Sequence, residues 1–261
     1  MQAYSGFAEV YDEFMDNVPY EEWADRFDAL IRRYSMPDSP EDGNEEKKIL
    51  VDLGCGTGVL TELMAGKGYN VWGIDLSPEM LAVAQEHKAS TGQDILYICQ
   101  DMREVELPFQ VPYCISACDC VNYLLTDDDL LAMFRSVHSS LLPDGLFLFD
   151  FNTLHKYRDV IGDTTIAESR ENAAFIWENW FDPDSRINEY DLTLFTKKSP
   201  EDPDSEEFLR SIETHYQRGY TAEEMLSCAQ KAGFRLLESM DADDNGPVRS
   251  ESERVLFVLR K

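Results

Sequence analysis

The sequence predicts an α/β fold with a doubly wound, mostly parallel sheet and an inserted antiparallel β cap. Between residue 48 and about residue 152, short apolar runs alternate with helical patterns, as in strand–helix–strand units. The first run, at 49–51, leads into three glycines at alternate positions, which indicate a tight turn. After residue 152 consecutive strand patterns follow. We therefore assign the core to 48–152 and 219–261, and the cap to 153–218.

The segment 1–47 is predicted to be helical up to about residue 34 and then to form a solvated loop. Tyr4, Phe7 and Tyr11 share one face at helical spacing. Such an aromatic stripe is typical of core packing, and a contact of Tyr11 with a ligand is the alternative. The polar residues at 37–46 predict the loop.

The core is predicted to hold seven strands. Five are centred on residues 50, 72, 97, 115 and 147, and two span 234–240 and 254–259. Helices are expected at 59–67, 78–90 and 127–141, the last followed by a turn at 143–145. Ser77 and Pro78 suit the start of the second helix. Thr221 and Glu224 predict a capping box for a final helix that ends near residue 232.

The cap is predicted to contain three antiparallel strands, at 175–181, 188–195 and 208–216, with a turn at 182–185. Its many aromatic residues, among them Trp177, Trp180 and Tyr190, suit either an acceptor pocket or a dimer face. An exposed strand edge can pair with a second subunit, which leaves a homodimer open.

The charge of the chain argues against nucleic-acid partners. There are 51 acidic and 23 basic residues, for a net charge of −28. Affinity for nucleic acid depends on Lys and Arg that neutralise phosphates, and no basic stripe is present. A local basic pocket inside an acidic shell remains compatible with the sequence, and the simplest role of the acidity is solubility.

Composition and segment length predict a cytoplasmic protein without a bound metal. No apolar run approaches the roughly 20 residues of a membrane span, and the start of the chain does not have the pattern of a secretory signal. The six cysteines suit free cytoplasmic thiols. Cys114, Cys118 and Cys120 lie close together, but no second Cys or His pair follows at zinc-finger spacing.

The glycine turn carries the most specific signal. Asp52, Gly54, Gly56 and Gly58 give the spacing acidic-x-Gly-x-Gly-x-Gly directly after a strand. A dinucleotide fingerprint would require a further glycine where Val59 stands. The spacing found resembles the first motif of class I S-adenosylmethionine-dependent methyltransferases, whose Rossmann-like core has seven strands.

The next two strands end in the same family pattern. Asp75 closes the second strand, where a carboxylate can accept both hydroxyl protons of a ribose. Asp101 and Met102 follow the third strand, where the resemblance implies contact with adenine. It also implies that the glycines make room for the amino acid part of the cofactor, whose amino group Asp52 helps to hold. The predicted cofactor residues are Asp52, Gly54, Cys55, Gly56, Gly58, Asp75, Leu76, Asp101, Met102 and Asp119.

Three residues are candidates for a catalytic role. His215 lies near the end of the cap and suits a general base, although a lone histidine is often structural. Asn122 follows the fourth strand, where the resemblance implies proximity to the transferred methyl; the alternative is that it satisfies loop backbone. Tyr11 is followed by Asp12. This pair resembles the Tyr-Asp pattern near the end of an N-terminal helix that closes over the cofactor in many related small-molecule methyltransferases.

The sequence thus predicts a methyltransferase that moves a methyl group from S-adenosylmethionine to O or N of a small molecule, leaving S-adenosylhomocysteine. Three alternatives remain open at this point. A nicotinamide-dependent dehydrogenase would use the same kind of fold, a cofactor-binding interaction module would lack turnover, and the acceptor could be a protein or a modified RNA. No residue pattern identifies the acceptor.

Overall fold

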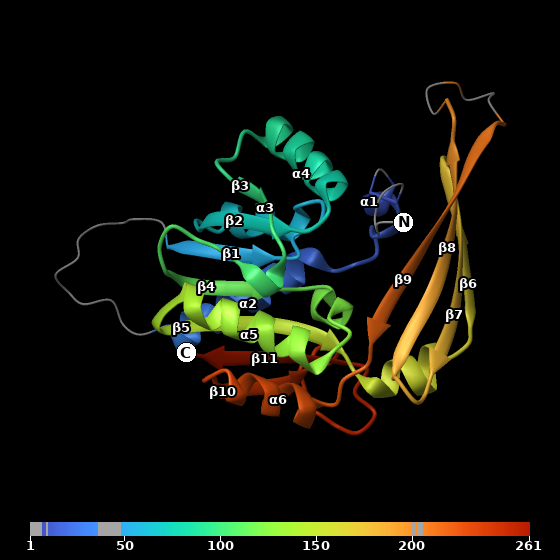
Figure 1. Cartoon of the computed structure of the whole chain (residues 1–261). Coiled ribbons are helices and arrows are strands. Elements are labelled where there is room, and N and C mark those ends of the chain that lie inside the picture. Colours follow the sequence, from blue (N-terminus) through green and yellow to red (C-terminus); the bar gives the residue numbers. More distant parts are fainter. Residues whose placement is uncertain (1–6, 9, 36–47, 200–201, 203–205) are drawn as a thin grey trace.

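Two β-sheets organise the described part of the chain, which in this computed structural model comprises residues 7–8, 10–35, 48–199, 202 and 206–261. The larger sheet has seven strands (Figure 1). Their order across the sheet is β10 (Arg235–Asp241), β11 (Arg254–Arg260), β5 (Leu141–Asn152), β4 (Val111–Ser116), β1 (Ile49–Leu53), β2 (Asn70–Asp75) and β3 (Leu96–Cys99).

The register of the large sheet confirms the doubly wound, mostly parallel architecture. The pairs β4–β5, β4–β1, β1–β2 and β2–β3 are parallel, whereas β11 runs antiparallel to both of its neighbours. From β1 the next two strands, β2 and β3, lie toward one edge of the sheet, whereas β4 and β5 lie on the other side of β1. The strand order therefore reverses between β1 and β4. The carboxyl ends of these two strands therefore flank the crevice where open α/β sheets bind ligands.

Helices cover both faces of this sheet. On one face α2 (Tyr20–Tyr34) and α3 (Val59–Gly66) bury apolar residues such as Phe27 and Met64. On the other, α5 (Asp127–Ser140) and α6 (Ala222–Lys231) bury Phe134 and Met225. A further helix, α4 (Pro78–Thr91), packs against β2 and β3. Ser77 caps α4, and Thr221 with Glu224 forms the predicted capping box of α6.

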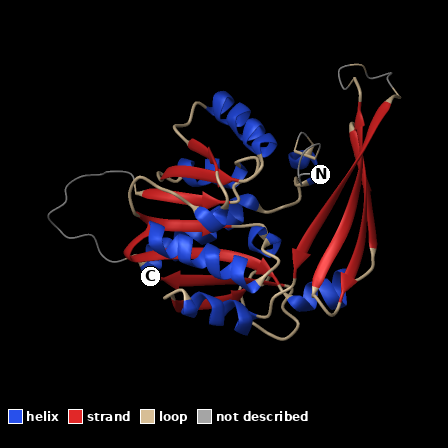
Figure 2. Ribbon diagram, in the orientation of Figure 1, coloured by secondary structure: helices blue, strands red, loops and turns tan. Residues whose placement is uncertain are grey.

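The smaller sheet, here called the cap sheet, is antiparallel and has the order β6 (Thr165–Ser169), β7 (Ala173–Asp182), β8 (Ile187–Lys197) and β9 (Phe208–Arg218). Its long strands stand at the side of the core (Figure 2). A π-helix, η3 (Lys156–Ile161), lies between β5 and β6 in the chain. One face of the sheet buries Phe175, Leu192 and Leu194 against Phe14 of α1 (Tyr11–Phe14).

The structure corrects three details of the sequence prediction. The cap sheet has four strands, because β6 is a mostly exposed edge strand whose composition gives little apolar signal. The N-terminal helix is interrupted at residues 15–19, before α2, where Pro19 precedes the first helical residue. Residues 143–145, predicted as a turn, belong to β5, where the pairing with β4 shifts register and the backbone of Asp144 takes the left-handed conformation. Tyr4 and the predicted loop at 37–46 lie outside the described residues.

Candidate functional site

A pocket of about 490 Å³ opens at the carboxyl ends of β1, β2 and β4. Its volume falls in the usual range for small-molecule sites, and most of its surface is apolar. Eight of the ten predicted cofactor residues line it: Asp52, Gly54, Cys55, Gly56, Asp75, Leu76, Asp101 and Met102. The position at the switch in strand order and this lining identify it as the candidate binding site.

The turn after β1 shapes the floor of the pocket. The backbone N–H groups of Gly54 and Cys55 both donate to the carbonyl of Ile74, at 2.7 and 3.1 Å. Gly56 has a φ of +55°, and a Cβ added there would meet no atom within 4 Å. A Cβ at Gly56 would therefore stand in open space. Gly58 does not line the pocket and instead packs beside Tyr97 and Ala84.

The carboxylate of Asp75 is fixed by two backbone donors. Gly56 N–H donates to Oδ2 at 2.9 Å, and Ser77 N–H donates to Oδ1 at 2.8 Å. Burial raises the pKa of Asp75, and these backbone hydrogen bonds oppose the shift. A carboxylate oxygen has more than one acceptor direction, so each can accept a second hydrogen bond. The exposed side chain of Leu76 follows on the rim.

Asp52 is a buried acid at the end of β1. Its Oδ2 accepts a hydrogen bond from Thr61 Oγ1 at 2.6 Å. Burial raises the pKa of Asp52 to about 7; the Thr61 hydroxyl opposes this shift, and the nearby charge of Asp75 adds to it. A carboxyl group with this pKa is strongly stabilised in its charged form by any cation that enters the pocket.

Asp101 is held by a neighbouring arginine. The guanidinium of Arg103 donates to both oxygens of Asp101, at 2.6–3.1 Å, and also to Asp129 at 2.6 Å. These hydrogen bonds hold the pKa of Asp101 below its usual value. Arg103 and Asp129 line the pocket beside Met102. Neither residue was predicted from the sequence, because their link to Asp101 depends on the packing of α5 against η1 (Met102–Glu104).

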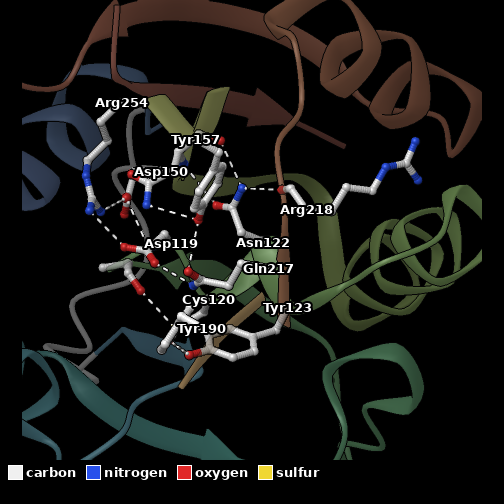
Figure 3. Close-up of polar contacts among 12 residues, drawn as sticks. Asp119, Cys120, Asn122, Tyr123, Asp150, Tyr157, Tyr190, Gln217, Arg218 and Arg254 are labelled. Carbon is white, nitrogen blue, oxygen red and sulfur yellow. Dashed lines mark hydrogen bonds and ion pairs between the residues drawn. The ribbon is translucent and has the colours of Figure 1, made fainter. Parts of the chain in front are cut away.

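Asp119 does not line the pocket and belongs to a polar junction between core and cap (Figure 3). Its Oδ1 pairs with Arg254 at 2.8 Å, and its Oδ2 accepts from Gln217 of β9 at 2.7 Å. Arg254 also pairs with the buried Asp150. Asp119 has a φ of +52°, next to Cys118 at +59°. This junction holds the segment after β4 in a strained backbone conformation.

Asn122 belongs to the same junction (Figure 3). Its amide donates to the carbonyls of Asn152 and Arg218, at 2.9 and 2.8 Å, and its oxygen accepts from the Asn152 N–H. It is fully buried and does not line the pocket. Its side-chain amide therefore forms hydrogen bonds with the backbone of the last residues of β5 and β9.

Aromatic side chains are part of the pocket lining. Tyr11, Tyr20 and Tyr123 all line it, and the first two hydrogen bond to each other. Beside Tyr11, Asp12 accepts from Thr57 Oγ1 at 2.7 Å, which ties α1 to the glycine turn. A run of pocket residues after η2 (Cys120–Tyr123) was also not predicted, because it forms no recognisable motif: Leu124, Leu125 and Thr126.

His215 is buried in the cap sheet and does not line the pocket. Its Nδ1 lies 3.1 Å from the hydroxyl of Tyr123, and its Nε2 lies 3.4 Å from Oε2 of Glu213. The described residues contain no group of three or more His, Cys, Asp or Glu side chains arranged for a metal ion. No helix in the described ranges is both long enough and apolar enough to cross a membrane.

Comparison with known proteins assigns the family. A model of the methyltransferase domain matches residues 50–145. A Bacillus subtilis (strain 168) protein named "Putative methyltransferase YqeM" is 36% identical over 260 residues, with 99% of this chain and 97% of that protein covered. The crystal structure of an S-adenosylmethionine-dependent methyltransferase from Clostridium acetobutylicum ATCC 824 is 26% identical, covers 99% of both chains and has a TM-score of 0.84.

The chain belongs to the class I S-adenosylmethionine-dependent methyltransferases. This confirms the family and the cofactor expected from the glycine motif, and excludes the dehydrogenase alternative. The pocket of this methyltransferase fits the cofactor: Gly56 leaves open space where a Cβ would stand, and the carboxylate of Asp75 has free acceptor directions. The fold is also shared with CalS10, an amino pentose methyltransferase from Micromonospora echinaspora, at 18% identity and a TM-score of 0.71.

Proposed function

We propose that this methyltransferase moves a methyl group to an oxygen or nitrogen atom of a small molecule. The observation that carries the proposal is the lining of the pocket, which is mostly apolar and includes the aromatic side chains of Tyr11, Tyr20 and Tyr123. Pockets for small molecules are typically concave and aromatic, with few polar groups. A nucleic-acid acceptor would instead require basic side chains, which the net charge of −28 does not favour.

The residues of the pocket have separate roles in this proposal. Asp75 accepts hydrogen bonds from the ribose hydroxyls, Asp52 stabilises the ammonium group, and Leu76 and Met102 contact the adenine. When bound, S-adenosylmethionine supplies a methyl carbon activated by a sulfonium. The chain then has mainly to align the acceptor with that carbon, and alignment can contribute on the order of 7–11 kcal/mol. Tyr11 closes the pocket over the cofactor.

Proteins of the same fold support a small acceptor. CalS10 is described as an amino pentose methyltransferase, and KedS8 from Streptoalloteichus sp ATCC 53650 as a sugar N-methyltransferase. The alignments cover 96% and 97% of this chain, so they include the cap sheet. An amine or hydroxyl on a small polar ring is therefore the acceptor class we would test first.

A labelling experiment tests the proposal. Methyl-tritiated S-adenosylmethionine and the enzyme are added to a heat-treated bacterial extract, separated by ultrafiltration and extraction into small-molecule, protein and RNA fractions. We expect tritium in the small-molecule fraction, and none with Asp75→Ala. Label in protein or RNA would overturn the small-molecule acceptor. Binding of S-adenosylmethionine without label in any fraction would favour a module without turnover.

The raised pKa of Asp52 predicts pH-dependent binding of S-adenosylhomocysteine. The folded-state pKa, about 7, lies above the usual value of 3.8, so the free protein holds a proton that the ligand ammonium displaces. Affinity should fall as the pH decreases below 7, by up to about tenfold per pH unit for one linked proton. Calorimetry between pH 5.5 and pH 7 measures this, with Asp52→Asn expected to bind weakly and without that slope. An equal slope in Asp52→Asn would assign the proton to another group, such as Asp75.

A further inference from the structure

We infer that Thr61 is a positioning residue for the cofactor: its hydroxyl keeps the Asp52 carboxylate charged and leaves the second oxygen of that group for the ligand ammonium. Asp52 lines the pocket, whereas Thr61 does not. Any effect of Thr61 on the ligand is therefore transmitted by Asp52. This inference rests on the role of Asp52 in the proposed function, and it adds the residue on which that role depends.

The hydrogen bond between Thr61 and Asp52 has a defined direction. Oγ1 of Thr61 lies 2.6 Å from Oδ2 of Asp52, and an ionised carboxylate can only accept, so the hydroxyl proton points to Oδ2. Among the described residues, Thr61 alone donates a hydrogen bond to the Asp52 side chain. Oδ1 is thus the oxygen that can meet a donor in the pocket. Asp52 precedes the glycine turn and Thr61 follows it in α3, so the bond also spans the turn.

Burial makes the charge of Asp52 dependent on this donor. Thr61 is fully buried and Asp52 is 2% exposed, so water contributes little to the stability of the carboxylate. The titratable groups that face Asp52 come from the glycine turn and from three strands of the large sheet: Cys55 in the turn, Asp75 on β2, Tyr97 on β3 and Cys114 on β4. All four are acids or neutral groups, and none of them can neutralise a carboxylate. Thr61 therefore provides the main local stabilisation of the charged form in the free protein.

The neighbours of Thr61 do not compete for its proton. The thiol of Cys55 and the phenol of Tyr97 both face the Thr61 hydroxyl. Burial raises the pKa of both groups, so each keeps its own proton and can donate it to the lone pairs of Oγ1. The hydroxyl proton of Thr61 therefore remains available to Asp52.

The test compares Thr61→Val with Thr61→Ser. The first variant keeps the branched shape of the side chain and removes the hydroxyl, whereas the second keeps the hydroxyl and removes the methyl group. Calorimetric titration of S-adenosylhomocysteine at pH 7, in buffers of different ionisation enthalpy, gives both the affinity and the number of protons released on binding. Thermal unfolding shows whether each variant is folded.

Proton release is the readout that a merely structural role would not change. Because the pKa of Asp52 is about 7, the free wild type holds about half a proton there at pH 7, which the ligand ammonium displaces. Thr61→Val should release about one proton, because loss of a hydrogen bond to a charged group shifts the titration upward by roughly one to two pH units. Its affinity should be roughly 5- to 50-fold weaker at pH 7, and the deficit should shrink several-fold by pH 8.5. Thr61→Ser should behave like the wild type.

Two results would overturn the inference alone. One is equal proton release by Thr61→Val and the wild type. The other is a Thr61→Ser variant that matches Thr61→Val, which would assign the effect to packing instead of the hydroxyl. Failure of the proposed role of Asp52 has a different signature, because Asp52→Asn would then release as many protons as the wild type, and the inference would fail with it. The labelling experiment tests methyl transfer separately, and its result does not enter this comparison.

Discussion

Asp75→Ala is expected to weaken binding of S-adenosylmethionine and S-adenosylhomocysteine about 100- to 1,000-fold. In our proposal its two oxygens accept both ribose hydroxyls, and each hydrogen bond to a charged group contributes about 1.5–3 kcal/mol. Two such bonds therefore account for roughly 3–4 kcal/mol or more, at 1.4 kcal/mol per tenfold change in affinity. The variant also removes the acceptor of the Gly56 and Ser77 N–H groups, which loosens the turn that the ligand contacts.

Calorimetry on the folded variant measures the change in affinity. Glu86→Gln is the matched control, because it removes a carboxylate from an exposed position on the helix that follows Asp75. The control should bind like the wild type. If Asp75→Ala kept an affinity within about threefold of the wild type, with its thermal unfolding unchanged, the ribose would not be held by Asp75.

The substitution Gly54→Ala is expected to lower the free energy of unfolding by about 2–4 kcal/mol. Gly54 has a φ of +73°, and the left-handed conformation costs an L-residue roughly 1–2 kcal/mol. Its new Cβ would also stand 2.5 Å from Sγ and 2.7 Å from Cβ of Cys120. Overpacking of this kind typically costs about 1–3 kcal/mol.

Gly56→Ala provides the comparison for Gly54→Ala. Its φ of +55° carries a similar conformational cost, but its Cβ would enter open space. We expect a loss of only about 1–2 kcal/mol from the backbone, together with weaker cofactor binding, because the Cβ narrows the pocket. Chemical denaturation of both variants measures the difference. Equal destabilisation by the two substitutions would contradict the close contact between the turn and Cys120.

The part of the site that the sequence predicted is the part that local pattern determines. Asp52, Gly54 and Gly56 follow one strand and Asp75 closes the next, so parallel pairing alone brings them to one edge of the sheet. Patterns that span only a few residues, for strands, turns and helix caps, were enough to predict this arrangement. The edge strand β6 was missed because its residues are largely exposed and give no apolar alternation.

The contacts that join core and cap could not be predicted in this way. Asp119 pairs with Arg254 and Gln217, which lie 135 and 98 residues further along the chain. Asn122 likewise joins the backbone at Asn152 and Arg218. Side chains of these types suit a ligand site as well as a structural junction, and only the packing of the cap sheet on the core distinguishes the two.

The position of His215 shows the same limit. Its residue type and place near the end of the cap suggested a base, yet it does not line the pocket; its Nδ1 lies 3.1 Å from the hydroxyl of Tyr123, which does. The alternation of Glu213 and His215 on one face of β9 was visible in the sequence. The contact of His215 with Tyr123 of η2, a core residue 92 positions earlier in the chain, was not visible there.

A crystal structure of the protein with S-adenosylhomocysteine tests the central claim most directly. We predict the ligand in the pocket at the ends of β1, β2 and β4, with both ribose hydroxyls within hydrogen-bonding distance of Asp75. A ligand bound elsewhere, or bound in this pocket with its ribose away from Asp75, would contradict it.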